Sequence, residues 1–237
     1  RAASPDQGPD AAVALLRGVA ECSHLRSLDL RGSQLSRVAV QRLSTLLRGL
    51  SLVSLSLQDC FLGDAVEPVL DAVSVCRSLV HLNLRLNGIA GHAGTEVCRA
   101  LDESVSLTEV DLSSNDLGDD FGRTLALVLA TNETLWKVDL TRNPLHEGAG
   151  DALLGVLQRK NDTLVSIGDI EEDLLGLGLS NRMLINACLE SNARGVRLDQ
   201  RDHDQTHLGL HHFKWEVLET PKDWVGPPPC EPLLAIL

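Results

Sequence analysis

The sequence predicts an α/β solenoid in which copies of one strand–helix unit stack side by side. Two observations support this fold class. A leucine pattern recurs at a nearly constant period, and each copy changes from the alternation typical of a strand to the spacing typical of a helix. A period of about 28 residues fits one supersecondary unit, which buries its apolar edge only against its neighbours.

Five copies of the pattern L-x-x-L-x-L-x-x-[N/C/S]-x-[L/I] follow one another at nearly equal spacing. They begin at Leu25, Leu52, Leu79, Leu107 and Leu135. A sixth, degenerate copy begins one period later at Leu164. Apolar and polar residues alternate at the start of each copy, so we expect a short strand with one buried face. A constant rise between copies stacks these strands into a parallel sheet.

A small polar residue follows each predicted strand, where the chain must leave the sheet. These turn residues are Ser33, Cys60, Asn87, Asn115 and Asn143. An asparagine amide both donates and accepts hydrogen bonds, so stacked copies can form a ladder to neighbouring backbone groups. Serine and cysteine are small enough for the same position, with weaker hydrogen bonding.

The second half of each copy has helical spacing. Apolar residues recur ten, thirteen and fourteen positions after the turn residue, as at Leu125, Val128 and Leu129. In three copies a glycine lies seven positions after it, at Gly94, Gly122 and Gly150. We assign the apolar residues to the core and expect these glycines to let each helix approach the next unit closely.

The pattern resembles the ribonuclease-inhibitor-like subfamily of leucine-rich repeats. The resemblance extends over about residues 25–170 and rests on the length of the period and on cysteine or asparagine at the turn. It implies a right-handed horseshoe with parallel strands on the concave face and helices on the convex face. The family includes ribonuclease inhibitor, tropomodulin-like actin-filament cappers, innate-immune sensor domains and structural proteins of cilia and flagella, which implies binding rather than catalysis.

We divide the chain into three parts. Residues 1–24 are an N-terminal segment with a cap helix, residues 25–192 are the solenoid with a C-terminal capping helix, and residues 193–237 are an extended tail. The capping helix is predicted over residues 177–191. The side of it that covers the end of the core is expected to hold Leu179, Met183, Leu184, Ala187 and Cys188.

Composition narrows the choice of partners. The net charge of −12 disfavours nucleic acid and anionic membranes, since both need basic patches. No apolar run is long enough to span a bilayer, and the first residues do not resemble a signal peptide. Six cysteines without paired spacing indicate free thiols in a reducing compartment. We therefore expect a cytoplasmic protein, in the cytoskeleton or in a cilium or flagellum, with protein partners and no small-molecule substrate.

A histidine cluster near the C-terminus is the strongest candidate for metal chemistry. His207 and His211 have the i, i+4 spacing of a zinc pair, with Asp204 and His212 close in sequence. Gly209 weakens a helix there, so we expect hydrated or hydrogen-bonded histidines and no metal or cofactor. No nucleophile–base pair or glycine-rich phosphate loop has a recognisable context. We expect no catalytic residue and no enzyme.

Two glycosylation sequons begin at Asn132 and Asn161, at equivalent positions of their copies. Both positions lie at a helix end just before the next predicted strand. We interpret these asparagines as caps determined by the repeat rather than as glycan acceptors.

Strand positions that face away from the core form three columns on the concave face. The first column is Ser27, Ser54, His81, Glu109 and Lys137. The central column is Asp29, Ser56, Asn83, Asp111 and Asp139. The third column is Arg31, Gln58, Arg85, Ser113 and Thr141. From these columns we select as partner-binding residues Arg31, Gln58, His81, Asn83, Arg85, Glu109, Asp111, Lys137 and Asp139.

This polar face of mixed charge suits a protein or peptide bound through salt bridges and hydrogen bonds. We therefore predict a non-catalytic interaction scaffold that belongs to a cytoskeletal or flagellar assembly, with the C-terminal tail as a second candidate contact. The alternative is a regulator of a GTPase, because the family includes the acidic activating protein of the small GTPase Ran. This chain differs from that protein in its shorter repeat array and its histidine- and proline-rich tail.

Overall fold

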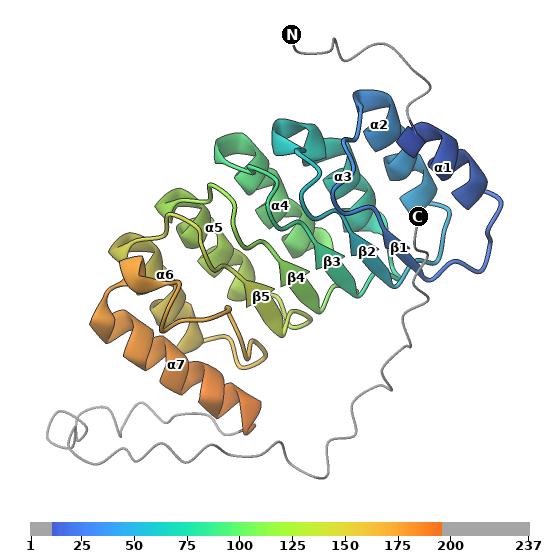
Figure 1. Cartoon of the computed structure of the whole chain (residues 1–237). Coiled ribbons are helices and arrows are strands. Elements are labelled where there is room, and N and C mark those ends of the chain that lie inside the picture. Colours follow the sequence, from blue (N-terminus) through green and yellow to red (C-terminus); the bar gives the residue numbers. More distant parts are fainter. Residues whose placement is uncertain (1–10, 196–237) are drawn as a thin grey trace, which may run out of the picture. The chain divides into compact units, whose positions relative to one another are not determined.

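The computed structural model describes residues 11–195, which form one solenoid of stacked strand–helix units (Figure 1). The strands are β1 (Ser27–Asp29), β2 (Ser54–Ser56), β3 (His81–Asn83), β4 (Glu109–Asp111) and β5 (Lys137–Asp139). The helices are α1 (Ala11–Val19), α2 (Arg37–Leu47), α3 (Glu67–Val75), α4 (Gly91–Glu103), α5 (Asp119–Leu129), α6 (Glu147–Leu157) and α7 (Leu179–Ala193). Two short 3-10 helices are η1 (Gly63–Val66) and η2 (Leu175–Leu177).

The strands form one parallel sheet in which each strand pairs with the next one along the chain. The register aligns the middle residue of each strand across the sheet, at Leu28, Leu55, Leu82, Val110 and Val138. These middle residues are buried, whereas both neighbours in each strand face solvent at least in part. The helices lie behind the sheet (Figure 1). The predicted α/β solenoid is confirmed.

The core lies between the sheet and the helices. Leu125, Val128 and Leu129 of α5 are buried, as their spacing predicts. The backbone of Gly122 lies so close to α6 that a Cβ atom at this position would collide with the Cβ of Ala149. Glycine therefore permits the close packing of these two helices.

The asparagine turn residues connect each unit to the preceding one. The Asn115 side chain is buried, and its Nδ2 donates to the carbonyl oxygens of Leu84 (3.1 Å) and Leu112 (2.8 Å). Its Oδ1 accepts from the backbone N–H groups of Asn87 (3.0 Å) and Ile89 (3.1 Å). Its Nδ2 also donates to the Ser113 carbonyl oxygen (3.3 Å), so one side chain pairs five backbone groups that belong to two adjacent units.

The residue before each turn residue has a left-handed backbone. Its φ lies between 55° and 71° in all five units, at Gly32, Asp59, Leu86, Ser114 and Arg142. Glycine adopts this conformation freely, but a leucine side chain there costs about 1–2 kcal/mol. Leu86 is also exposed, so burial does not offset this strain.

A second row of polar caps lies at the opposite end of the strands. Asn161 is buried, and its Nδ2 donates to the Leu129 carbonyl oxygen (2.8 Å) while its Oδ1 accepts from the Leu164 N–H (2.9 Å). Asn132 makes the equivalent bonds one unit earlier. Both sequon asparagines thus hold the entry into the next strand, and Asn192 of α7 extends the row.

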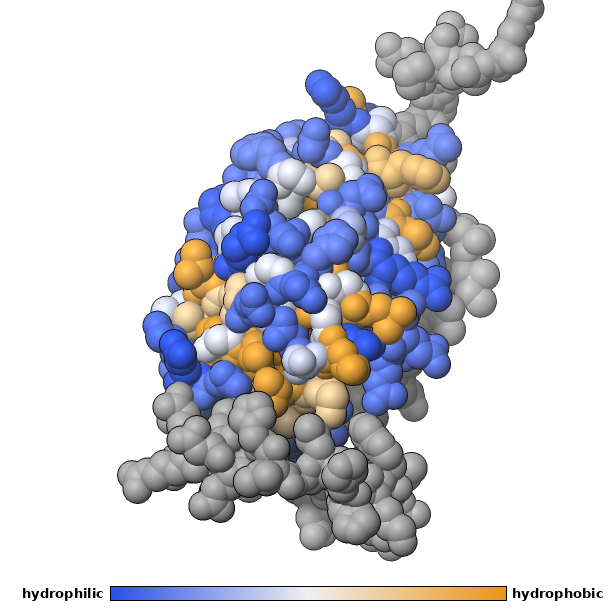
Figure 2. All heavy atoms as spheres, turned by 90° about the vertical axis from the view of Figure 1, so that its left-hand side faces the viewer, coloured by the Kyte–Doolittle hydropathy of each residue, from blue (hydrophilic) through white to orange (hydrophobic). Residues whose placement is uncertain are grey.

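The last unit departs from the predicted pattern. Its strand is reduced to a single backbone bridge between Lys137 and Ser166. The prediction of which side of the capping helix faces the core was wrong, except at Cys188. Ile185, Cys188 and Leu189 are buried, whereas Leu179, Met183 and Leu184 are 66%, 52% and 37% exposed and Ala187 is exposed too. Apolar residues occupy both sides of α7, so their spacing alone does not identify the buried side. Figure 2 views the solenoid from this end and shows hydrophobic side chains at its surface.

The predicted tail beyond Gly195, the pair His207 and His211, and Cys230 lie outside the described residues. No helix among the described residues is long and apolar enough to span a membrane.

Within the described residues, five cysteines are free thiols, of which Cys22 is exposed and Cys60, Cys76, Cys98 and Cys188 are buried. Burial raises the pKa of the Cys60 thiol to about 11 and that of the Cys98 thiol to about 12. Burial also raises the pKa of Cys188. These environments suppress the thiolate that nucleophilic chemistry requires.

We expect Asn115→Ala to lower the free energy of unfolding by about 2–4 kcal/mol, because buried backbone groups of two units lose their partners. Urea denaturation followed by circular dichroism measures this change. Asn186→Ala is the control, since the Asn186 amide of α7 donates to the Glu190 carboxylate on the same helix (3.3 Å) and, within residues 11–195, bonds to no backbone group of another unit. Its expected change is below about 0.5 kcal/mol, and equal effects of the two substitutions would contradict a special role for the ladder.

We expect Leu86→Asn to raise the free energy of unfolding by about 0.5–1 kcal/mol, because asparagine tolerates the left-handed backbone better than leucine. Leu127→Asn makes the same replacement at an exposed leucine in the helix α5. It should lower stability by about 0.5 kcal/mol through weaker helix propensity. Urea denaturation of both variants measures whether their free energies of unfolding change in opposite directions. A lower free energy of unfolding for Leu86→Asn would show that the leucine backbone is not strained.

We expect iodoacetamide at about pH 8 to alkylate Cys22 quickly and to leave Cys60 and Cys98 unmodified until urea is added. At that pH a thiol with a pKa of about 11 is ionised in about one molecule in a thousand. Peptide mass spectrometry at timed intervals follows each cysteine. Labelling of Cys98 in the native protein as fast as Cys22 would show that its buried environment opens readily.

Candidate functional site

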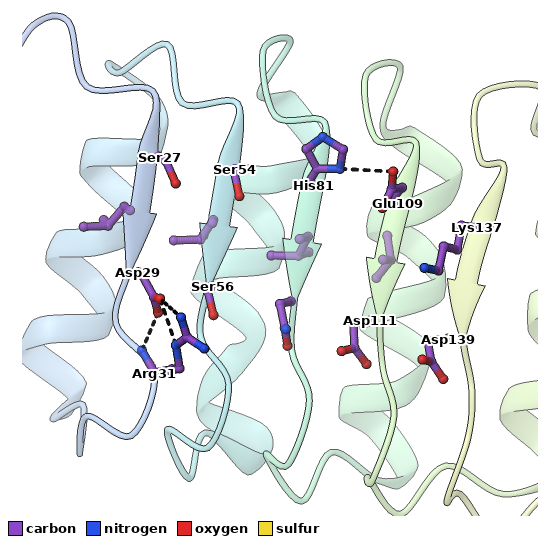
Figure 3. A pocket seen from close by; sticks show the side chains of 15 residues that line it. Ser27, Asp29, Arg31, Ser54, Ser56, His81, Glu109, Asp111, Lys137 and Asp139 are labelled. Atoms are coloured by element: carbon purple, nitrogen blue, oxygen red, sulfur yellow. Dashed lines mark hydrogen bonds and ion pairs between the residues drawn. The ribbon is translucent and has the colours of Figure 1, made fainter. Parts of the chain in front are cut away.

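A shallow hollow of about 440 Å³ crosses the concave face of the solenoid (Figure 3). All five strands contribute to its lining, because the outward positions of parallel, in-register strands meet on one surface. The side chains that point into it are polar or charged at every labelled position (Figure 3). The hollow is therefore a solvated polar surface rather than an apolar ligand cavity.

Seven of the nine predicted partner-binding residues line this hollow. They are Arg31, His81, Asn83, Glu109, Asp111, Lys137 and Asp139. Gln58 and Arg85 do not line it. Strand alternation also places Ser27, Asp29, Ser54 and Ser56 on this face, and all four line the hollow although they were not among the selected residues.

The third column is not a continuous exposed row. Ser113 is 0% exposed and Thr141 is 6% exposed, so the prediction that they face the concave surface was wrong. The chain begins its turn at these residues, and their hydroxyl groups donate to Asp111 Oδ1 (2.6 Å) and Asp139 Oδ1 (2.7 Å). Arg85 Nη1, from the preceding unit, donates to the Ser113 hydroxyl (3.4 Å).

The central column is held in place by short-range hydrogen bonds. In four of the five units, the Oδ1 atom of the central-column residue accepts a hydrogen bond from the backbone N–H of the residue two positions later, over 2.9–3.1 Å. The units concerned contain Asp29, Asn83, Asp111 and Asp139. The second carboxylate oxygens of Asp111 and Asp139 make no hydrogen bond to the described part of the chain. These carboxylates are consequently fixed in direction but available to a ligand.

The first half of the hollow is internally neutralised. Arg31 Nη2 lies 2.6 Å from Asp29 Oδ2, and Arg31 Nε donates to the same oxygen over 2.8 Å (Figure 3). Burial acts to raise the pKa of Asp29, but hydrogen bonds from Arg31 outweigh it and hold that pKa below its usual value. The positive charge of Arg31 is thus largely cancelled by the Asp29 carboxylate, two residues before it in the chain.

The second half of the hollow carries a negative excess. Glu109, Asp111 and Asp139 supply three carboxylates, and Lys137 supplies one ammonium group (Figure 3). His81 Nδ1 lies 3.6 Å from Glu109 Oε1, which is too long for a strong hydrogen bond. This half of the face favours a ligand that presents cationic groups, with Lys137 placed to meet one acid.

Trp136 immediately precedes Lys137, whose side chain lines this acidic half. It is 36% exposed, so part of its surface is accessible to solvent. Tryptophan is a frequent anchor of protein interfaces. Trp136 therefore supplies an aromatic group next to a surface whose described lining residues include none.

Metal-dependent chemistry has no visible site in the described residues. Within residues 11–195, no group of three or more histidine, cysteine, aspartate or glutamate side chains is arranged to hold a metal ion. What the concave face offers is an extended array of fixed hydrogen-bonding groups, which suits recognition of a macromolecular surface.

Comparisons with known proteins agree with this architecture. A family model for the leucine-rich repeat matches residues 21–44, 75–94 and 103–125. No curated protein sequence matches the chain.

Two solved structures share the fold. The tropomodulin C-terminal domain of Caenorhabditis elegans is 12% identical with a TM-score of 0.52, over 78% of this chain and 93% of that one. Actin-binding site 2 of leiomodin-1 is 14% identical with a TM-score of 0.54, over 84% of this chain and 97% of that one. Together with the stacked units and the asparagine ladder, these matches show that the chain has a leucine-rich-repeat fold similar to that of the tropomodulin C-terminal domain.

Proposed function

We propose that this protein is a non-catalytic interaction scaffold that binds a protein partner through its concave face, as part of a cytoskeletal assembly. The observation that carries the proposal is the polar hollow on that face. Five strands present polar side chains in register, and backbone hydrogen bonds orient four residues of the central column. Groups fixed in this way lose little conformational entropy when a partner binds.

Actin is the first partner to test. The leiomodin-1 structure that shares this fold is described as an actin-binding site, and the second neighbour is a tropomodulin domain. The identities of 12–14% relate folds rather than surfaces, so the actin proposal depends on direct measurement.

Binding would depend on charge pairs in the acidic half of the hollow. Glu109, Asp111 and Asp139 would receive cationic groups of the partner, and Lys137 would pair with one of its acids. Such exposed pairs set specificity and association rate more than affinity. Since Trp136 is the aromatic anchor available beside these charges and it is only partly exposed, we expect a dissociation constant on the order of 1–100 µM.

We expect Lys137→Glu to raise the dissociation constant for the partner about tenfold, because it replaces the one ammonium group of the acidic half by a fourth carboxylate. Lys137 is exposed, so the melting temperature should change by less than about 3 °C. Co-sedimentation with filamentous actin and fluorescence anisotropy with labelled monomeric actin measure binding. Charge reversal at Asp111 would change both binding and folding, because Asp111 Oδ1 accepts hydrogen bonds from the turn residue Ser113. Lys137→Glu avoids this second effect.

Lys160→Glu is the matched control, since Lys160 is an exposed lysine that does not line the concave hollow. It changes the net charge equally and should leave binding unchanged. If the unmodified protein binds neither form of actin, the actin assignment is wrong. If it binds and the two lysine variants behave alike, the concave face is not the binding surface.

A further inference from the structure

The outer side of α7 exposes an apolar stripe at the C-terminal end of the described solenoid, and Leu175 of η2, just before this helix in the chain, is exposed as well. Leu175, Leu179 and Met183 follow one another at four-residue intervals and are 61%, 66% and 52% exposed. Leu184 and Ala187 continue the same side of the helix. Within α7, residues at i and i+4 lie on one helical face, so Leu179, Met183 and Ala187 form a strip. A surface helix normally presents charged groups to water on this side.

The stripe is poor in charge, in a chain whose net charge is −12. Arg182 is the one charged side chain within residues 174–189, and Glu190, which follows Ala187 on the same side of the helix, is ion-paired with Arg194 Nη2 (2.9 Å). Arg182 Nη1 donates inward to the carbonyl oxygens of Ile170 (3.3 Å) and Glu171 (3.0 Å). Two copies of so acidic a chain repel each other over most of their surface, and this repulsion is least where both present a face with little net charge. The α7 stripe is such a face.

End-to-end stacking of solenoids would not bury the stripe against another apolar surface. In that arrangement α7 of one copy would pack against α1 of the next. Within residues 12–19 of α1, no large apolar side chain is more than partly exposed, so this part of α1 offers no comparable stripe. Head-to-tail contacts would also generate an open filament, whereas contact between two identical faces closes as a dimer.

Size complementarity favours an antiparallel pairing of the stripe with itself. Leu179 and Ala187 lie four residues to either side of Met183. A two-fold axis at Met183 therefore places the large Leu179 of one copy on the small Ala187 of the other. Parallel pairing would instead place leucine on leucine and alanine on alanine, and would align the two helix dipoles unfavourably.

We infer that the α7 stripe is a self-association surface, through which two copies of this chain form an antiparallel two-fold dimer. The 15-residue helix is about 22 Å long. One helix pair of that length buries less than the ~1,200 Å² of a stable interface, so the dimer is weak, with a dissociation constant of about 10–100 µM. The stripe lies outside the concave hollow, so the dimer is separable from partner binding.

Sedimentation velocity of the full 237-residue chain, from about 5 to about 500 µM, tests the inference. We expect the mass to rise with concentration from 25.6 kDa towards twice that value. The double substitution Leu179→Glu with Met183→Glu should raise the dissociation constant at least about 100-fold, because it places four carboxylates in the interface. Should that variant lose its circular dichroism spectrum, Leu179→Ser with Met183→Ser provides the milder test.

Leu127→Glu is the matched control, because Leu127 is a 74% exposed leucine on α5, away from the stripe. It should dimerise like the unmodified chain. A chain that is monomeric throughout the range overturns the inference, and so does a dimer that survives substitution of Leu179 and Met183 or is equally disrupted by Leu127→Glu.

Cross-linking tests the antiparallel arrangement. In a background with Cys22→Ser and Cys230→Ser, Met183→Cys should form a disulfide-linked dimer under mild oxidation, because residue 183 lies on the two-fold axis. Leu127→Cys in the same background should remain monomeric. Absence of the Met183→Cys cross-link in a chain that dimerises would overturn the proposed geometry.

Discussion

Each unit of this solenoid leaves the sheet in a sharp turn, and the buried backbone groups of that turn need partners. Asparagine side chains supply them at Asn87, Asn115 and Asn143, and each bonds to its own unit and to the preceding one. Without them, buried N–H and C=O groups would be unpaired, each at a cost of about 1–3 kcal/mol. This ladder fixes the distance between units, and the register of the strands follows from it.

The regular spacing of side chains on the concave face follows from the same strand register. Since the middle residue of every strand points into the core, its two neighbours must point outward at regular spacing. The side chains of Asp29, Asn83, Asp111 and Asp139 then bond to the backbone where each strand ends. Under the proposed function, the groups that shape the turn are also those that a partner would meet. Charge reversal then separates binding from folding only at positions such as Lys137, whose side chain does not hold a turn.

In the C-terminal unit, α7 covers the core with one side and leaves apolar side chains exposed on its other side. Its strand is reduced to one bridge, and α7 packs inward through Ile185, Cys188 and Leu189. The opposite side of the helix is left with Leu179 and Met183 in solvent. A repeat buries its apolar edge only against another element, so this helix meets the core on one side and presents an unfilled side outward. The self-association that we propose would fill that side and leave the concave face accessible.

The sequence by itself determined the parallel strand order, the turn residues and seven of the nine selected residues of the concave face, because each is set by local periodicity repeated in adjacent units. Tertiary structure alone decided what depends on packing between units or on direction within a turn. Ser113 and Thr141 belong to an outward-facing column in sequence, but the turn folds their hydroxyl groups back onto neighbouring carboxylates. Apolar residues surround α7, so only its docking on α6 determined that Ile185 is buried and Met183 is exposed. Local periodicity describes which residues share a face, but which face is covered depends on contacts between residues far apart in the chain.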